Sequence, residues 1–91
     1  MSVVTKKSDT HEERYAHVKV DGVLCNRATV FARKDEKGWA VSVAYCSRKD
    51  IFSRDKGRGI ARRRFFFGQK SRLYEPISYE AMLKHATTFA P

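Results

Sequence analysis

Hydrophobic and polar residues alternate along the first half of this chain, whereas the second half has helical spacing. In the segments 15–20, 23–33 and 39–46, apolar side chains alternate with polar ones or form short β-branched runs. A period of two is typical of strands that bury one face. Turn-forming residues separate the segments, at Asp21-Gly22 and in the loop 34–38. The first half therefore predicts three antiparallel strands.

The register of the second and third segments follows from their apolar positions. If Lys34 lies opposite Trp39, then Val30 lies opposite Val43, and the apolar side chains of both strands share one face, as a half-buried sheet requires. The opposite face then carries cations, aromatic rings and small residues.

The first hairpin allows two turns. A two-residue turn at Asp21 and Gly22 would point Ala16 and Val18 away from the apolar face. A bulged three-residue turn that uses Gly22 keeps both side chains on that face, and it is our prediction.

Beyond residue 47 the chain shows helix signals. Ser53 is a good N-cap residue, and Asp55 would lie in the first turn, where the helix dipole favours a negative charge. These residues predict a helix over about 54–66, with Gly68 at its C-terminal cap and a loop over 69–76.

A second helix is predicted after Ser78, which would cap it. Its core-facing stripe has the spacing i, i+3, i+4 and i+7 and consists of Tyr79, Met82, Leu83 and Ala86. The chain as a whole predicts an α+β fold: a three-stranded antiparallel sheet followed by two helices (β-β-β-α-α), with a single layer of helix on the sheet. Residues 1–13 are polar and aperiodic and predict a flexible N-terminal arm, and residues 14–91 predict a single domain.

Charge is the compositional property that bears most on function. The 91 residues include 19 Lys and Arg against 10 Asp and Glu, which gives a formal net charge of +9. Such an excess attracts anionic partners, of which nucleic acid is the commonest, although an acidic protein surface or anionic lipid would also fit. A basic surface that only confers solubility is the plain alternative.

Several functional classes are not expected. Cys25 and Cys46 have neither the spacing of a zinc site nor the density of a secreted disulfide scaffold, which favours reduced thiols in the cytoplasm. No segment has the roughly 18 consecutive apolar residues of a membrane span, and the N-terminus does not resemble a signal peptide. The histidines and acidic residues form no catalytic or metal-binding motif. We therefore expect a cytoplasmic protein that is not an enzyme, with no metal, cofactor, small-molecule substrate or membrane contact.

Basic residues concentrate in the segment 54–72, which holds eight of them and one acid. On a helical wheel Arg54, Arg58 and Arg62 form one stripe, and Lys56 and Arg63 form a second edge. Guanidinium groups bind paired phosphate oxygens, and helix N-termini also bind anions. The predicted binding residues, for nucleic acid or an acidic partner, are Arg54, Lys56, Arg58, Arg62, Arg63, Lys70 and Arg72.

The remaining arc of this helix is predicted to dock on the sheet. It consists of Gly57, Ile60, Ala61 and Phe67, and Gly57 would allow a close approach near Val41 and Val43. A second candidate surface is the outer sheet face, where aromatic rings alternate with cations as in many nucleic-acid platforms; its residues are Tyr15, Lys19, Arg27, Phe31 and Arg33. Cross-strand packing, or burial beneath the last helix, is the alternative for that face.

One segment carries a specific pattern. After a strand that ends in Cys come Asp-x-Phe-Ser, a basic residue, Gly-Arg and a helix of small residues that ends in Arg, here Cys46, Asp50, Phe52, Ser53, Arg54, Gly57, Arg58, Ile60, Ala61 and Arg64. Over residues 44–64 the chain thereby resembles small, mostly uncharacterised proteins encoded by bacteriophages. The resemblance implies a phage or prophage origin and a strand-to-helix junction, and it implies no biochemical role.

Two functions are compatible with these features. The first is a phage-type accessory protein that binds nucleic acid, DNA or RNA, mainly through its phosphates. The second is an inhibitor or adaptor, of the anti-CRISPR or host-takeover type, that binds an acidic surface of a host protein. Both would act in the host cytoplasm, and both would use the same cations.

Overall fold

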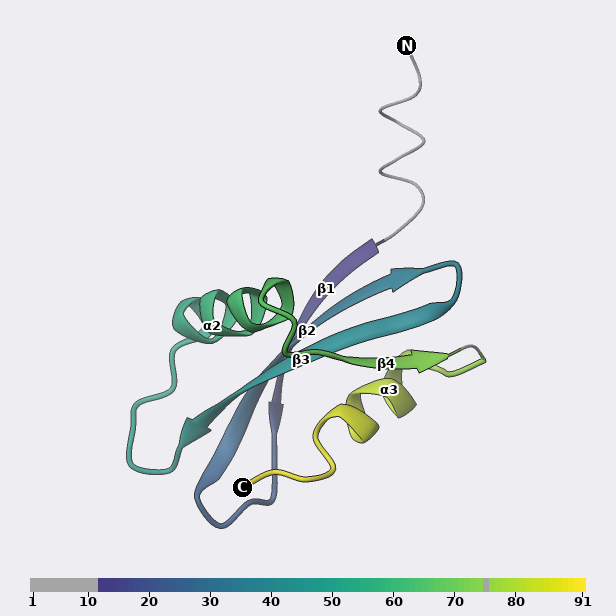
Figure 1. Cartoon of the computed structure of the whole chain (residues 1–91). Helices are drawn as coiled ribbons and strands as arrows, with labels where there is room; N and C mark the ends of the chain where they lie inside the picture. Colours follow the sequence, from purple (N-terminus) through teal and green to yellow (C-terminus); the bar gives the residue numbers. More distant parts are fainter. Residues whose placement is uncertain (1–11, 75) are drawn as a thin grey trace.

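Four antiparallel strands form one sheet in chain order, and two helices flank it (Figure 1). The computed structural model describes residues 12–74 and 76–91. The elements are β1 (Glu12–Lys19), β2 (Cys25–Asp35), β3 (Gly38–Ser47), α2 (Arg54–Phe66), β4 (Ser71–Tyr74) and α3 (Tyr79–Ala86). The predicted arm, residues 1–13, lies outside the described residues except for Glu12 and Glu13, which begin β1.

The predicted three-stranded sheet is wrong, because β4 adds a fourth strand within the segment expected to be a loop. This strand pairs with the beginning of β3, from Gly38 opposite Tyr74 to Val41 opposite Ser71. Helix α2 therefore lies between strands, in the order β-β-β-α-β-α. Only four residues form β4, so its period is too short to recognise along the chain. Its pairing depends on β3 being brought alongside it by the fold.

The single layer of helix is also wrong, because each face of the sheet has its own core. On one face the apolar side chains of β2 and β3 pack around Met82 of α3; the buried strand residues there are Val30, Ala32, Trp39 and Val41. On the other face Phe31, Ala40 and Ala44 pack against Ala61 and Phe65 of α2. Residues 28–32 of β2 and 38–42 of β3 are all buried, as expected of strands covered on both sides.

The predicted register is confirmed. Lys34 lies opposite Trp39 and Val30 opposite Val43. Ala16 lies opposite Val30 as well, on the β1 side, so the first strand presents its apolar residues to the same core.

The connection between β1 and β2 differs from the expected three-residue turn, because it extends from the end of β1 at Lys19 to Cys25. Two contacts from distant parts of the chain hold it. The guanidinium of Arg48 donates to the Gly22 carbonyl at 2.7 and 3.0 Å. The backbone N–H groups of Leu24 and Cys25 donate to the carbonyl of Pro91 at 3.0 and 3.2 Å. The loop between β1 and β2 is therefore held in place by Arg48, which follows β3, and by Pro91, which follows α3.

Helix α2 begins and ends as its sequence predicts. The Ser53 side chain accepts a hydrogen bond from the backbone N–H of Lys56, which satisfies a donor of the first turn. At the other end Gly68 has a φ of +88°, and its N–H donates to the carbonyl of Phe65. The N–H of Gln69 donates to the carbonyl of Arg64, which completes a Schellman motif. The left-handed position at Gly68 explains why a glycine ends this helix.

Helix α2 packs on the opposite sheet face from the one expected. Gly57 lies against Thr29, not near Val41 and Val43: a Cβ there would stand 2.2 Å from the Thr29 hydroxyl oxygen. The small residues of β3 on this face leave room for the helix, and the Ser42 hydroxyl donates to the carbonyl of Ala61. The face with Trp39 and the valines is covered by α3 instead.

The rotation of α2 about its axis also differs from the helical-wheel prediction, in which Phe67 faces the sheet. Phe65 is the buried phenylalanine, whereas Phe67 is 78% exposed. Arg64 is exposed, and its guanidinium donates to the carbonyl of Val43 at 2.9 Å.

Gly57 and Gly59 offer a matched pair of substitutions within α2. Gly59→Ala should stabilise the protein by about 1 kcal/mol, because the helix gains propensity and no atom lies within 4 Å of the added Cβ. Gly57→Ala should destabilise it by about 1 to 2 kcal/mol net, because overpacking against the buried Thr29 outweighs the same gain. Chemical unfolding measures both signs. Equal effects at the two positions would contradict this docking of α2.

Candidate functional site

The basic residues of α2 lie in two rows on either side of its solvent-facing crest. The β1-side row, Arg54, Arg58 and Arg62, runs above β1. The guanidinium of Arg62 reaches the Glu13 carboxylate at 3.2 Å and the Tyr15 hydroxyl at 3.4 Å. The β3-side row consists of Lys56 and Arg63, and Lys56 lines a hollow of about 220 Å³ beside the end of β3. Gly59 occupies the crest between the rows.

Arg62 has a structural role as well as a charge. Its guanidinium stacks over the rings of Phe31 and Phe66, at 5.4 and 4.9 Å from their centroids. The hydrogen bonds to Tyr15 and Glu13 raise the pKa of Arg62 above its usual value, so it stays fully charged. Because Arg62 ties α2 to β1, reversing its charge would disturb the packing of the helix in addition to any binding.

The seven predicted binding cations fall into two groups. Three have carboxylate partners: Arg58 with Asp55, Arg62 with Glu13, and Arg72 with Asp35. In the part of the chain that the structure describes, no ion pair involves the other four, which are all exposed: Arg54, Lys56, Arg63 and Lys70. These four provide positive charge that no neighbouring carboxylate offsets.

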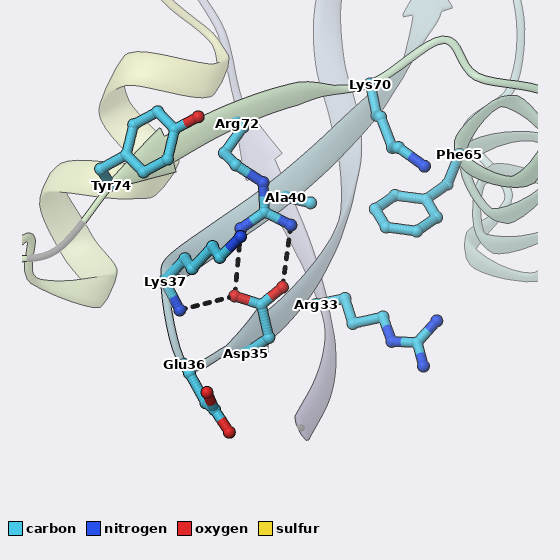
Figure 2. A pocket seen from close by; sticks show the side chains of 9 residues that line it. All are labelled: Arg33, Asp35, Glu36, Lys37, Ala40, Phe65, Lys70, Arg72 and Tyr74. Atoms are coloured by element: carbon cyan, nitrogen blue, oxygen red, sulfur yellow. Dashed lines mark hydrogen bonds and ion pairs between the residues drawn. The ribbon is translucent and has the colours of Figure 1, made fainter. Parts of the chain in front are cut away.

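A depression of about 470 Å³ lies beyond the C-terminal end of α2 (Figure 2). The sheet continues past the helix there, so the hairpin end of β2 and β3 is uncovered on this face. Four cations and two carboxylates line the depression together with two aromatic rings and Ala40; the lining residues are Arg33, Asp35, Glu36, Lys37, Ala40, Phe65, Lys70, Arg72 and Tyr74. We call this feature the hairpin depression.

Two contacts give the hairpin depression its shape. Arg72 binds the Asp35 carboxylate with both terminal nitrogens, at 3.0 and 2.8 Å, and the backbone N–H of Lys37 donates to the same carboxylate (Figure 2). The Arg72 hydrogen bonds first, and then that of Lys37, hold the pKa of Asp35 well below its usual range. The Lys70 ammonium lies 4.8 Å from the centroid of the Phe65 ring. Arg72 therefore already neutralises Asp35. The other lining residues include three cations and one carboxylate, so the net charge of the depression is positive.

The second predicted surface, the outer sheet face, is not a continuous platform, because α2 covers its centre. Phe31 is fully buried between the rings of Tyr15 and Phe65, 4.9 Å from each centroid. The covering helix is α2, not the last helix. At the far end Lys19 is exposed, and Arg27 stacks over Phe52 at 5.3 Å. Of this set only Arg33 joins the hairpin depression.

Sequence reasoning missed several residues of this region, above all Lys37, Tyr74 and the exposed phenylalanines that end α2. Phe66 and Phe67 are 52% and 78% exposed. A signal for them was present in the run Phe65-Phe66-Phe67, because consecutive helical residues point about 100° apart and cannot all face one core.

The described residues were also compared with the requirements of a metal site, a reactive thiol and a membrane span. Among them no group of three or more His, Cys, Asp and Glu side chains is placed to bind a metal ion. Both cysteines are free, and burial raises the pKa of the Cys25 thiol, which donates to the Pro91 carbonyl. Within residues 12–74 and 76–91, neither helix has the length and apolar character needed to cross a membrane.

Comparisons with protein-family models, with curated protein sequences and with solved structures find no match to this chain.

His17 of β1 gives a measurable test of the position of the β1-side row. Its Nδ1 lies 2.9 Å from the Thr29 hydroxyl, beneath α2. Burial first, and then the charges of Arg54 and Arg58, lower its pKa below 6.5. As the pH falls from about 6.5 towards the folded pKa, the unfolded chain takes up a proton that the folded protein does not, so stability decreases.

We therefore expect a lower melting temperature at about pH 5.5 than at about pH 7.5, with a smaller difference in His17→Gln. Titration of the His17 ring by NMR should show its pKa rising in Arg54→Gln. An unchanged pKa in that variant would mean that the row does not lie beside β1.

Proposed function

We propose that this protein binds nucleic acid, mainly through phosphate contacts from α2 and the segment that follows it. The observation that carries the proposal is the group of four exposed cations without carboxylate partners in the described structure: Arg54, Lys56, Arg63 and Lys70. Exposed guanidinium and ammonium groups bind phosphate oxygens through charge-assisted hydrogen bonds.

The asymmetry of charge supports the same proposal. Helix α2 carries six basic residues and one acid in thirteen positions, whereas α3 carries one Glu and one Lys besides His85. A basic surface that served solubility alone would have no need to collect its charge on one side of the sheet. The concentration on α2 creates a directional field that attracts a polyanion to this face.

The crest of α2 is shaped for close contact. Gly59 lies between the two basic rows, and nothing stands within 4 Å of the position its Cβ would occupy. The fold does not require a glycine there, and an exposed glycine costs the helix about 1 kcal/mol relative to alanine. Absence of a side chain at the crest allows a phosphate backbone to approach the helix between the rows.

The phage-type setting of the proposal rests on the resemblance of residues 44–64 alone. In that setting the protein would act in the cytoplasm of the host cell. DNA and RNA are both compatible with contacts to phosphates, because such contacts position a nucleic acid without reading its bases.

Binding should depend steeply on salt. Four phosphate contacts imply a slope of roughly −3 to −4 for the logarithm of the binding constant against the logarithm of salt concentration. Gel shift or fluorescence anisotropy with DNA and RNA oligonucleotides, from about 50 mM salt upward, measures this slope. Absence of binding to every nucleic acid at the lowest salt would refute the proposal.

Charge reversal identifies the face that binds. Arg63→Glu and Lys70→Glu should each weaken binding and make the salt slope shallower by about one unit, because each removes a phosphate contact. Lys84→Glu is the matched control: it makes the same change of charge on α3, which covers the other face of the sheet. An equal loss in the control would show that only total charge matters.

The alternative, an acidic protein as partner, gives a different result in a pull-down from bacterial lysate. Nuclease treatment should remove the captured material if nucleic acid is the partner. A protein that remains bound after nuclease treatment, and is lost in Arg63→Glu, would favour the alternative.

A further inference from the structure

Resting on the proposed function, we infer that the hairpin depression, with Tyr74, and the exposed Phe67 at the C-terminal end of α2 bind unpaired bases, so that the protein prefers single-stranded nucleic acid to duplex. The inference starts from the exposure of aromatic rings at this end of the molecule. Phe67 is 78% exposed and Tyr74 67% exposed. In the described residues Phe67 makes no stacking contact with another ring, and it belongs to neither hydrophobic core.

The aromatic rings lie among cations. Phe67 follows Arg63 by one helical turn, and its backbone N–H donates to the Arg63 carbonyl at 3.0 Å, so the two side chains lie on the same side of α2. Tyr74 lines the depression from β4, on the opposite side of the Arg72–Asp35 pair from Phe65 (Figure 2). Rings that offer a free face beside cations suit a strand of nucleic acid, whose bases stack on the rings while its phosphates meet the cations.

The size of the depression agrees with this occupant. Its volume of about 470 Å³ lies in the range of sites that hold molecules as large as a nucleotide. Because Arg72 already neutralises Asp35, the exposed Lys37 and Lys70, for which the described residues show no ion pair, are available to the phosphates of the same strand. An aliphatic or acidic peptide would not use the flat faces of two exposed rings in this way.

The stacking of base pairs in a duplex is what makes the site selective. In a duplex the faces of the bases are covered by their neighbours, so exposed rings reach only the phosphates and sugars. In a single strand the bases can turn outward and stack on the rings, largely without regard to sequence. The four cations without carboxylate partners would bind either form, whereas the rings of Phe67 and Tyr74 would bind only the unpaired one.

The test compares one oligonucleotide as a single strand and as a duplex, at the same salt concentration. The wild-type protein should bind the single strand more tightly. Phe67→Ala and Tyr74→Ala should each weaken binding of the single strand at least about fivefold, the loss expected for one stacked base, and leave duplex binding unchanged. Tyr74→Phe keeps the ring and should keep the affinity. Melting temperatures of all variants show that the fold is retained.

Phe89→Ala is the matched control, because Phe89 is 89% exposed and lies near the C-terminus, which contacts the opposite end of β2. If duplex is preferred, or if the ring variants bind the single strand like the control, this inference is overturned while the proposed function stands on Arg63→Glu and Lys70→Glu. If no nucleic acid binds at all, both fail together.

Discussion

The contact between α2 and the sheet determines which side chains of this helix face solvent, and the basic surface depends on it. Gly57 lies directly on Thr29, the Ser42 hydroxyl donates to Ala61, and the ring of Phe65 meets that of Phe31 edge to face. These contacts fix the rotation of α2 about its axis. Since successive helical residues point about 100° apart, a change of one position would send different arginines towards solvent. The arrangement of the basic surface is thus a consequence of apolar packing.

With this rotation, the groups around each basic residue of α2 decide whether it takes part in the packing or remains available for a partner. The β1-side row lies above an edge strand that offers Glu13 and Tyr15, so Arg62 becomes part of the packing. The β3-side row has no such neighbours in the described structure, and Lys56 and Arg63 remain available for a partner. Residue type alone does not separate these roles, because ion pairing depends on which strand lies beneath each guanidinium.

Element lengths explain where the hairpin depression forms. Thirteen residues of helix extend about 20 Å, whereas eleven residues of strand extend about 36 Å. Helix α2 starts over the middle of the sheet at Thr29, ends near Ala40, and leaves the hairpin end open. Strand β4 borders this open region and adds Arg72 and Tyr74 to it. An edge strand of four residues therefore contributes more to the candidate site than to the core.

The sequence by itself determined the local features: the bounds of α2, its Ser53 cap and Gly68 terminus, the stripe of α3, and the register of β2 with β3. Each follows from neighbouring residues or from a period of apolar positions. Only the tertiary structure decided which sheet face each helix covers, that Ser71–Tyr74 pairs with β3, and which phenylalanine of residues 65–67 is buried. Both faces of β2 and β3 can be buried, so their pattern does not assign a helix to either one. That choice depends on how bulky and small residues of distant elements fit together, and the available cations were determined with it.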